Sequence, residues 1–96
     1  MKHCILVKWN EQVSDRQAIA AEVEGLYSGA AEITGVRGVR LLRNCVDRSN
    51  RYDLLIELDM EKEALSDWDA SALHHRWKEQ YGSLIAAKAI FDFEKE

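Results

Sequence analysis

Three side chains that could do chemistry share one face of an expected helix. In the stretch SALHHRWKEQY, His74, Trp77 and Tyr81 follow the spacing i, i+3 and i+7, which places residues on the same side of an α-helix. An imidazole titrates near neutral pH, so it can remove a proton next to a carbonyl group and return it after a carbon–carbon bond has formed. The pattern therefore predicts a candidate site in which His74 is a general base beside aromatic walls.

A second histidine, His3, lies on the first expected strand and could orient His74 or a substrate oxygen. We expect both histidines to face a cleft between the helices and the sheet, and an apolar cleft with a few polar groups is typical of small-molecule sites. The expected substrate-binding walls are Ile5, Val7, Ile56, Leu58, Trp68, Trp77 and Ile90. The alternative for the histidines is a purely structural hydrogen bond, and the alternative for the tryptophans is a place in the core.

The sequence contains no metal-ligand pattern and indicates no cofactor. His74 and His75 are adjacent, point about 100° apart around a helix and lack the i, i+4 spacing of two zinc ligands. Cys4 and Cys45 fall in no metal-binding spacing and are too few for a disulfide framework. We therefore expect reduced cysteines, no metal and a cofactor-free site.

Length and charge limit the class of protein. Ninety-six residues, 47% of them hydrophobic and 31% charged, suit one globular domain over 1–96. The net charge of -4 counts against nucleic acid as a partner, because such binding needs a basic surface. No apolar run approaches the roughly 20 residues that span a membrane, so we expect a soluble cytoplasmic protein without a membrane partner.

Hydrophobic periodicity predicts four strands and two helical regions. The expected order is a strand over 1–9, a helix that begins after Ser14 with Gln17 as its capping-box partner, strands over 39–46 and 52–58, a short helix capped by Asp59, another capped by Ser71, and a strand over 86–93. The first strand is apolar on both faces, as an inner strand is. Arg40 and Arg43 indicate that 39–46 is an edge strand.

The order βαββαβ is typical of a ferredoxin-like α+β fold with a four-stranded antiparallel sheet. Right-handed crossovers place all helices on one face of that sheet. The opposite face is then left uncovered with its apolar side chains Leu6, Leu55, Ala89, Phe91 and Phe93. We expect a second copy of the chain to cover it, so that the two sheets pair face to face in a homodimeric α+β barrel.

Several segments, in this order and spacing, resemble the stress-responsive A/B barrel (Dabb) domain. They are KHCILVKW at the start, VSDRQ before the first helix, ITGV at 33–36, YDLLIELD at 52–59, His74 after a short helix, and AIFDFE near the end. The resemblance implies a dimeric ferredoxin-like α+β barrel and an association with stress response. It implies no single reaction, because most members of the family have none assigned.

A more distant similarity, to the plant polyketide cyclase of this family (olivetolic acid cyclase), implies roles for the two histidines. In that enzyme the histidines that match His74 and His3 perform acid/base chemistry in an intramolecular aldol condensation. Two tyrosines orient this chemistry in the cyclase, and the matching positions of this chain hold Trp68 and Gly25. The chain therefore departs from the cyclase at both tyrosine positions.

Three hypotheses about function are open on the sequence. The first is a homodimeric small-molecule-binding protein of uncharacterised biochemical role, with a small apolar or carbonyl ligand. The second is a cyclase- or lyase-like enzyme that uses His74 as general base on a carbonyl substrate. The third is a purely structural dimer whose pocket has collapsed around Trp68 and Trp77.

Overall fold

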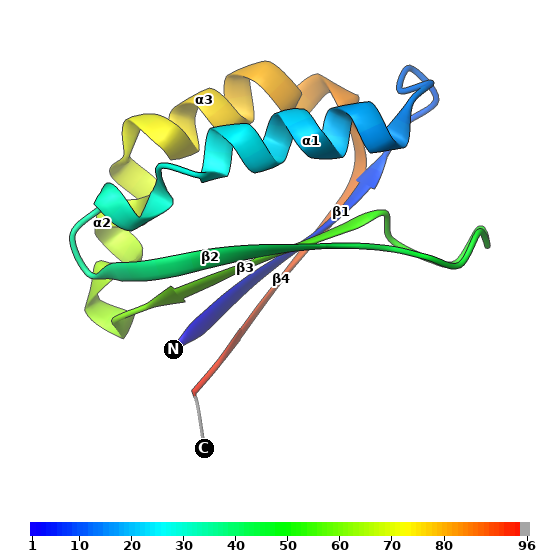
Figure 1. Cartoon of the computed structure of the whole chain (residues 1–96). Coiled ribbons are helices and arrows are strands. Elements are labelled where there is room, and N and C mark those ends of the chain that lie inside the picture. The colour runs from blue at the N-terminus through cyan, green and yellow to red at the C-terminus, as the bar shows by residue number, and fades with distance from the viewer. Residues whose placement is uncertain (95–96) are drawn as a thin grey trace.

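The chain folds into a four-stranded antiparallel sheet with its helices on one face (Figure 1). The computed structural model describes residues 1–94. In chain order the elements are β1 (Lys2–Trp9), α1 (Arg16–Tyr27), η1 (Ala30–Glu32), β2 (Val36–Arg43), β3 (Leu54–Met60), η2 (Lys62–Ala64), α2 (Leu65–Ala70), α3 (Ala72–Tyr81), η3 (Gly82–Leu84) and β4 (Ile85–Phe93). The strands lie in the order β2-β3-β1-β4, so the predicted ferredoxin-like α+β fold is confirmed.

Strand β1 is an inner strand, as its two apolar faces predict. It pairs with β3 on one side and with β4 on the other. In the β1–β4 register His3 lies opposite Asp92, and Ile5 lies opposite Ile90. These side chains share one face of the sheet, because alternate residues of a strand point the same way. The register therefore brings the first few residues of the chain against its last strand.

The two longest helices begin at side-chain caps. In α1 the cap is Asp15, whose carboxylate accepts the backbone N–H of Ala18 at 3.0 Å. The predicted cap at Ser14 is therefore wrong by one residue, because a cap must directly precede the first helical residue to reach the amide three residues on. In α3 the predicted cap is confirmed, since Ser71 Oγ accepts the backbone N–H of His74 at 3.1 Å.

The strand boundaries differ from the sequence prediction around β2 and β3. Strand β2 is an edge strand as predicted, but it starts at Val36, before the expected 39–46, because an irregularity in pairing between Val36 and Gly38 lets the ladder continue past the glycine. Asp59 caps no helix. It lies inside β3 and pairs with Lys2, and the helical turn η2 begins only at Lys62.

One glycine is required by the turn into β2. Gly35 has a φ of 85°, a left-handed conformation that suits glycine. A Cβ atom at this position would lie 2.6 Å from the Cβ atom of Ala64 in η2. The absence of a side chain therefore lets the start of β2 lie close against η2.

The core fills the space between the sheet and the helices. Its large and fully buried side chains are Val7, Val23, Tyr27, Ile56, Leu58, Met60, Trp68 and Trp77. Tyr27 packs against two of these rings, with centroids 5.6 Å from Trp68 and 5.6 Å from Trp77.

None of the helices in residues 1–94 has the length and the apolar composition that a membrane span requires.

The opposite face of the sheet carries no helix (Figure 1). Phe91 is 64% exposed, Phe93 is 42% exposed and Leu42 is 43% exposed. Leu6 and Leu55 lie opposite each other on the same face and are half-buried. The prediction that local topology covers only one face of the sheet therefore holds for the described residues.

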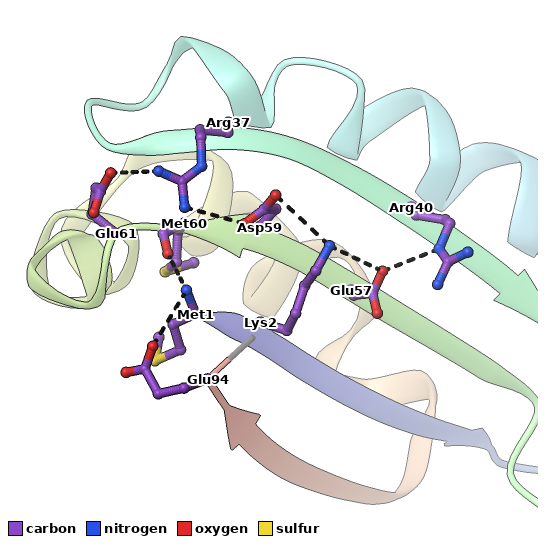
Figure 2. Close-up of polar contacts among 9 residues, drawn as sticks. All are labelled: Met1, Lys2, Arg37, Arg40, Glu57, Asp59, Met60, Glu61 and Glu94. Carbon is purple, nitrogen blue, oxygen red and sulfur yellow. Dashed lines mark hydrogen bonds and ion pairs between the residues drawn. The ribbon is translucent and has the colours of Figure 1, made fainter. Parts of the chain in front are cut away.

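The rest of this open face carries a network of paired charges (Figure 2). Lys2 Nζ lies 3.8 Å from Glu57 Oε2 and 3.7 Å from Asp59 Oδ2. Arg40 Nε donates to Glu57 at 3.0 Å, and Arg37 pairs with Asp59. Because every charge in this set has a partner of opposite sign, the network leaves little net charge beside the apolar half of the face.

Candidate functional site

A cleft of about 270 Å³ lies between the sheet and the helices α2 and α3. Strands β1 and β4 supply the sheet wall, and the two helices supply the facing wall. The lining residues are His3, Ile5, Leu65, Asp69, His74, Trp77, Lys88, Ile90 and Asp92. Both predicted histidines therefore face one cleft, together with three of the predicted wall residues: Ile5, Trp77 and Ile90.

Four predicted wall residues do not line this cleft. Val7, Ile56, Leu58 and Trp68 are completely buried. The centre of the sheet lies directly under the helices, so side chains there are covered, whereas the cleft opens toward the edge strand β4, where Ile90 is half exposed. The structure places these four side chains in the core and not on the wall of this cleft, and their role as substrate-binding residues stays a prediction.

Tyr81 also belongs to the core and not to the cleft wall. Its ring lies 5.4 Å from Trp77 and 6.3 Å from Trp9, measured between centroids. The predicted helix face is present, since Trp77 and Tyr81 both point to the interior. Only His74 and Trp77 of that face reach the cleft.

The side chain of His74 is held by the preceding helix. Its Nδ1 atom lies 3.0 Å from the backbone carbonyl oxygen of Asp69, and its ring packs against Trp68 at an interplanar angle of 59°, with centroids 5.1 Å apart. A carbonyl oxygen can only accept a hydrogen bond, so Nδ1 carries the proton and donates it. In the neutral ring the lone pair is therefore on Nε2, the atom that a general base uses to take a proton.

The surroundings favour the neutral form of His74. Burial is the main cause and lowers the pKa of the imidazole below its ordinary value. The Asp69 carbonyl and carboxylate raise this pKa, whereas the charges of Lys78 and Lys88 lower it further. The net lowering means that His74 is mostly neutral at pH 7 and can accept a proton.

The side chain of His3 is held by a carboxylate across the sheet. Its Nδ1 atom lies 2.5 Å from Asp92 Oδ1, and the imidazole is almost completely buried. The carboxylate of Asp92 accepts from Nδ1–H and leaves Nε2 as the second functional atom of the ring. The cleft thus has an imidazole on each wall, each fixed through its Nδ1 atom.

Four lining residues were not predicted as site residues: Leu65, Asp69, Lys88 and Asp92. Alternation along β4 does put Lys88 and Asp92 on the same face as Ile90, so a signal for these two was present in the sequence. Asp69 contributes its backbone carbonyl to His74, and a backbone contact has no residue-type signal.

Among residues 1–94 there is no group of three or more His, Cys, Asp or Glu side chains that could hold a metal ion. Cys4 is buried and Cys45 is exposed, and both are free thiols.

A second hollow of about 320 Å³ lies between α1 and the segment after β2, where Arg16 and Arg43 are among its lining residues. Its lining contains no imidazole, whereas His3 and His74 both line the cleft between β1, β4, α2 and α3.

Comparisons with known proteins identify the fold. No protein-family model and no curated protein matches this sequence. A dimeric ferredoxin-like protein of unknown function from Thermobifida fusca is 17% identical, with a TM-score of 0.81 over 98% of this chain and 89% of that chain. A Dabb family protein with a ferredoxin-like fold from Mesorhizobium loti is 12% identical, with a TM-score of 0.72 over 99% of this chain and 95% of that chain. This chain has the ferredoxin-like fold of these proteins.

One structurally similar protein is an enzyme. A hydroxynitrile lyase from Passiflora edulis is 10% identical to this chain, with a TM-score of 0.74 over 96% of this chain and 89% of that chain. The resemblance seen in the sequence is thus confirmed at the level of the fold. The residues of the cleft, and not the fold, must supply the argument for function.

Proposed function

We propose that this chain binds a small carbonyl compound in the His74 cleft and that His74 acts there as a general base. The observation that carries the proposal is the hydrogen bond from His74 Nδ1 to the carbonyl oxygen of Asp69. It leaves the lone pair of the neutral ring on Nε2, and burial lowers the pKa of the imidazole, so the base form dominates at neutral pH. Proton removal next to a carbonyl requires no metal or cofactor.

The contents of the cleft support a cyclase- or lyase-like reaction. His74 would remove a proton from a carbon next to a carbonyl, or from the hydroxyl group of a hydroxynitrile. His3, held by Asp92, would orient the substrate from the opposite wall. A hydroxynitrile lyase among the fold neighbours supports the lyase branch. The purely structural alternative predicts a collapsed interior, and the cleft of about 270 Å³ counts against it.

We further propose that the functional form is a cytoplasmic homodimer, with the stress-associated role that the Dabb resemblance implies. Exposed Leu42, Phe91 and Phe93 lie on the sheet face that no helix covers. A short chain buries a smaller fraction of its surface on folding than a long chain does, so a second copy on this face would add materially to stability. Structural neighbours from Thermobifida fusca and Bacteroides fragilis are described as dimeric, which supports self-association.

Deuterium exchange provides the test of the proposed base. Wild-type protein in D2O should accelerate deuterium incorporation next to the carbonyl of phenylacetone, followed by proton NMR, or release cyanide from mandelonitrile. The His74→Ala variant should lose this activity by about two orders of magnitude or more, because a positioned general base contributes about that much.

The neighbouring histidine offers a matched control. His75 is exposed and its Nδ1 donates to the Ser71 carbonyl at 3.0 Å, and it does not line the cleft. The His75→Ala variant should keep full activity. Equal rates in wild-type protein and the folded His74→Ala variant would remove His74 from the role of base.

A further inference from the structure

Lys88 is the one lysine or arginine that lines the His74 cleft in the described chain. It lies on β4 directly opposite Val7 of β1, while Asp92 lies opposite His3. Asp92 lies four positions after Lys88 along the strand, a distance of about 13 Å between their backbones. The sheet wall of the cleft therefore has a cation toward one end and a carboxylate at the other.

The charge of Lys88 is available to a ligand. Within residues 1–94 its ammonium group has no hydrogen-bond or ion-pair partner, whereas Asp92 is engaged by His3. Lys88 is close enough to His74 for its charge to contribute, after burial, to the lowered pKa of the imidazole. A free cation near the proposed base is thus a feature of the cleft that the base itself does not use.

Other donors are less suited to stabilise negative charge on a substrate oxygen. His3 already donates Nδ1–H to the Asp92 carboxylate, and that neighbouring negative charge opposes an anion at the same ring. The Tyr27 hydroxyl is buried without a partner, but Tyr27 does not line the cleft. Lys88 remains the donor on the cleft wall that is an ammonium group.

We propose that Lys88 Nζ donates a hydrogen bond to the substrate oxygen that becomes negatively charged when His74 removes a proton. The proposal rests on the proposed function and narrows its substrate class to carbonyl compounds that react through an enolate, or hydroxynitriles that react through an alkoxide. In the enolate case His74 Nε2 takes the proton, and the electron pair of the C–H bond becomes the new C=C bond. The carbonyl π pair moves onto oxygen.

The protons of Lys88 and His74 have different fates in this reaction. Lys88 keeps its proton throughout and only donates a hydrogen bond to the oxygen. In the enolate case the imidazolium of His74 returns the proton once the new carbon–carbon bond has formed. In the hydroxynitrile case the alkoxide electron pair becomes the C=O π bond, the C–CN bond breaks, and the leaving cyanide takes the proton from the imidazolium. Neither case needs an oxidant, a reductant or a further reactant. A preformed charged donor aimed at developing negative charge is a common and effective catalytic device.

A phenol serves as a probe of this donor, because its phenolate oxygen resembles an enolate oxygen and the bound form can be followed by absorbance. We expect wild-type protein to bind 4-nitrophenolate more tightly than neutral 4-nitrophenol, so that binding lowers the pKa of the probe. The Lys88→Met variant should bind the phenolate about tenfold more weakly and lose that lowering, since hydrogen bonds to charged groups are the strong ones. The Lys88→Arg variant should retain a large part of it.

Lys78 provides the matched control. Its charge also lowers the pKa of His74, but Lys78 does not line the cleft. The Lys78→Met variant removes the same charge from the protein and should leave the preference for phenolate unchanged. A loss common to both lysine variants would identify a general charge effect and overturn the proposal.

The outcome separates this proposal from that for His74. The His74→Ala variant should keep the phenolate preference, because binding a preformed anion requires no base. Suppose that the His74→Ala variant keeps catalysis while the Lys88→Met variant loses the preference for phenolate. His74 is then not the base, but Lys88 is still the hydrogen-bond donor to the anion. Wild-type protein that shows no preference for phenolate, or a Lys88→Met variant that keeps it, would overturn the donor assignment.

Discussion

Asp92 lies directly opposite His3 in the pairing of β1 with β4, and its carboxylate oxygen is 2.5 Å from the ring nitrogen Nδ1. The two residues are 89 positions apart in the sequence. Sheet pairing alone brings them together, and the contact fixes which nitrogen of the buried imidazole is left to act in the cleft. On the helix wall of the cleft, His74 is also fixed through its Nδ1 atom, which donates a hydrogen bond to the backbone carbonyl of Asp69.

Replacing Asp92 by asparagine should loosen the orientation of the His3 ring without unfolding the protein. Asp92 is exposed at the edge strand, so the variant should keep its free energy of unfolding within about 0.5 kcal/mol. Turnover or ligand binding in the cleft should weaken, because the amide holds the ring less strongly than the carboxylate does. Asp67→Asn on α2, outside the cleft, is the control, and equal loss in both variants would contradict an orienting role.

The activity of the cleft should depend on pH through His74. Its pKa lies below the ordinary 6.5, so the rate should rise with pH through a midpoint below 6.5 and be level at neutral pH. The charged or titratable groups around the ring are Asp69 on α2, Lys78 on α3, Lys88 and Asp92 on β4, and His3 on β1. A rate that is still rising above pH 7 would contradict the assignment.

The lowered pKa of His74 should also make the free energy of unfolding depend on pH. Because the folded chain binds this proton less readily than the unfolded chain does, the contribution of His74 to the free energy of unfolding is larger above pH 6.5. That contribution should fall as the pH drops through 6.5 toward the lower folded pKa. Urea unfolding at a series of pH values, compared with His74→Ala, isolates it, and a contribution that increases on acidification would have the wrong sign.

Tyr27→Phe should stabilise the protein. The Tyr27 hydroxyl is completely buried and has no hydrogen-bond partner, and burial raises the pKa of the phenol far above its ordinary value. Removing an unpaired buried hydroxyl while keeping the ring should raise the free energy of unfolding by about 1 kcal/mol. Urea denaturation measures this, with the half-buried Tyr52→Phe as control. A decrease of similar size would mean that the hydroxyl has an internal partner.

Phe91→Glu should break the proposed homodimer and leave the fold of each subunit intact. Phe91 is 64% exposed on the open sheet face, so the single chain loses little by the change. Sedimentation at micromolar concentration should give a dimer for the wild type and a monomer for the variant. Val46→Glu makes the same change at an exposed apolar residue outside the strands and should stay dimeric. A monomeric wild type would contradict the assembly.

Local patterns predicted the fold well because strands and helices have fixed side-chain periods. The alternation of β1 identified an inner strand, and that of β4 correctly put Ile90 toward the helices. The cap of α1 was misplaced because Ser14 and Asp15 are adjacent candidates, and only the carboxylate directly before Arg16 has the geometry. Local sequence offers no means of choosing between two good caps.

The site was predicted less completely because its position across the sheet is a tertiary property. Period-two alternation shows that Val7 and Ile5 share a face, and both are buried, but it does not show which of them lines the cleft. The register of β1 with β4 decides that Ile5 reaches the cleft and that Asp92 meets His3. The two histidines were found because their side-chain chemistry is rare in a chain with three histidines.

Nitrogen-15 NMR of the His74 ring reports directly which ring nitrogen carries the proton. At neutral pH we expect a neutral imidazole with the proton on Nδ1, held by the Asp69 carbonyl, and an unprotonated Nε2 whose chemical shift changes when phenylacetone is added. His75 in the same spectrum should show no response to the ligand. A His74 ring that is protonated on Nε2, or positively charged at pH 7, would contradict the account.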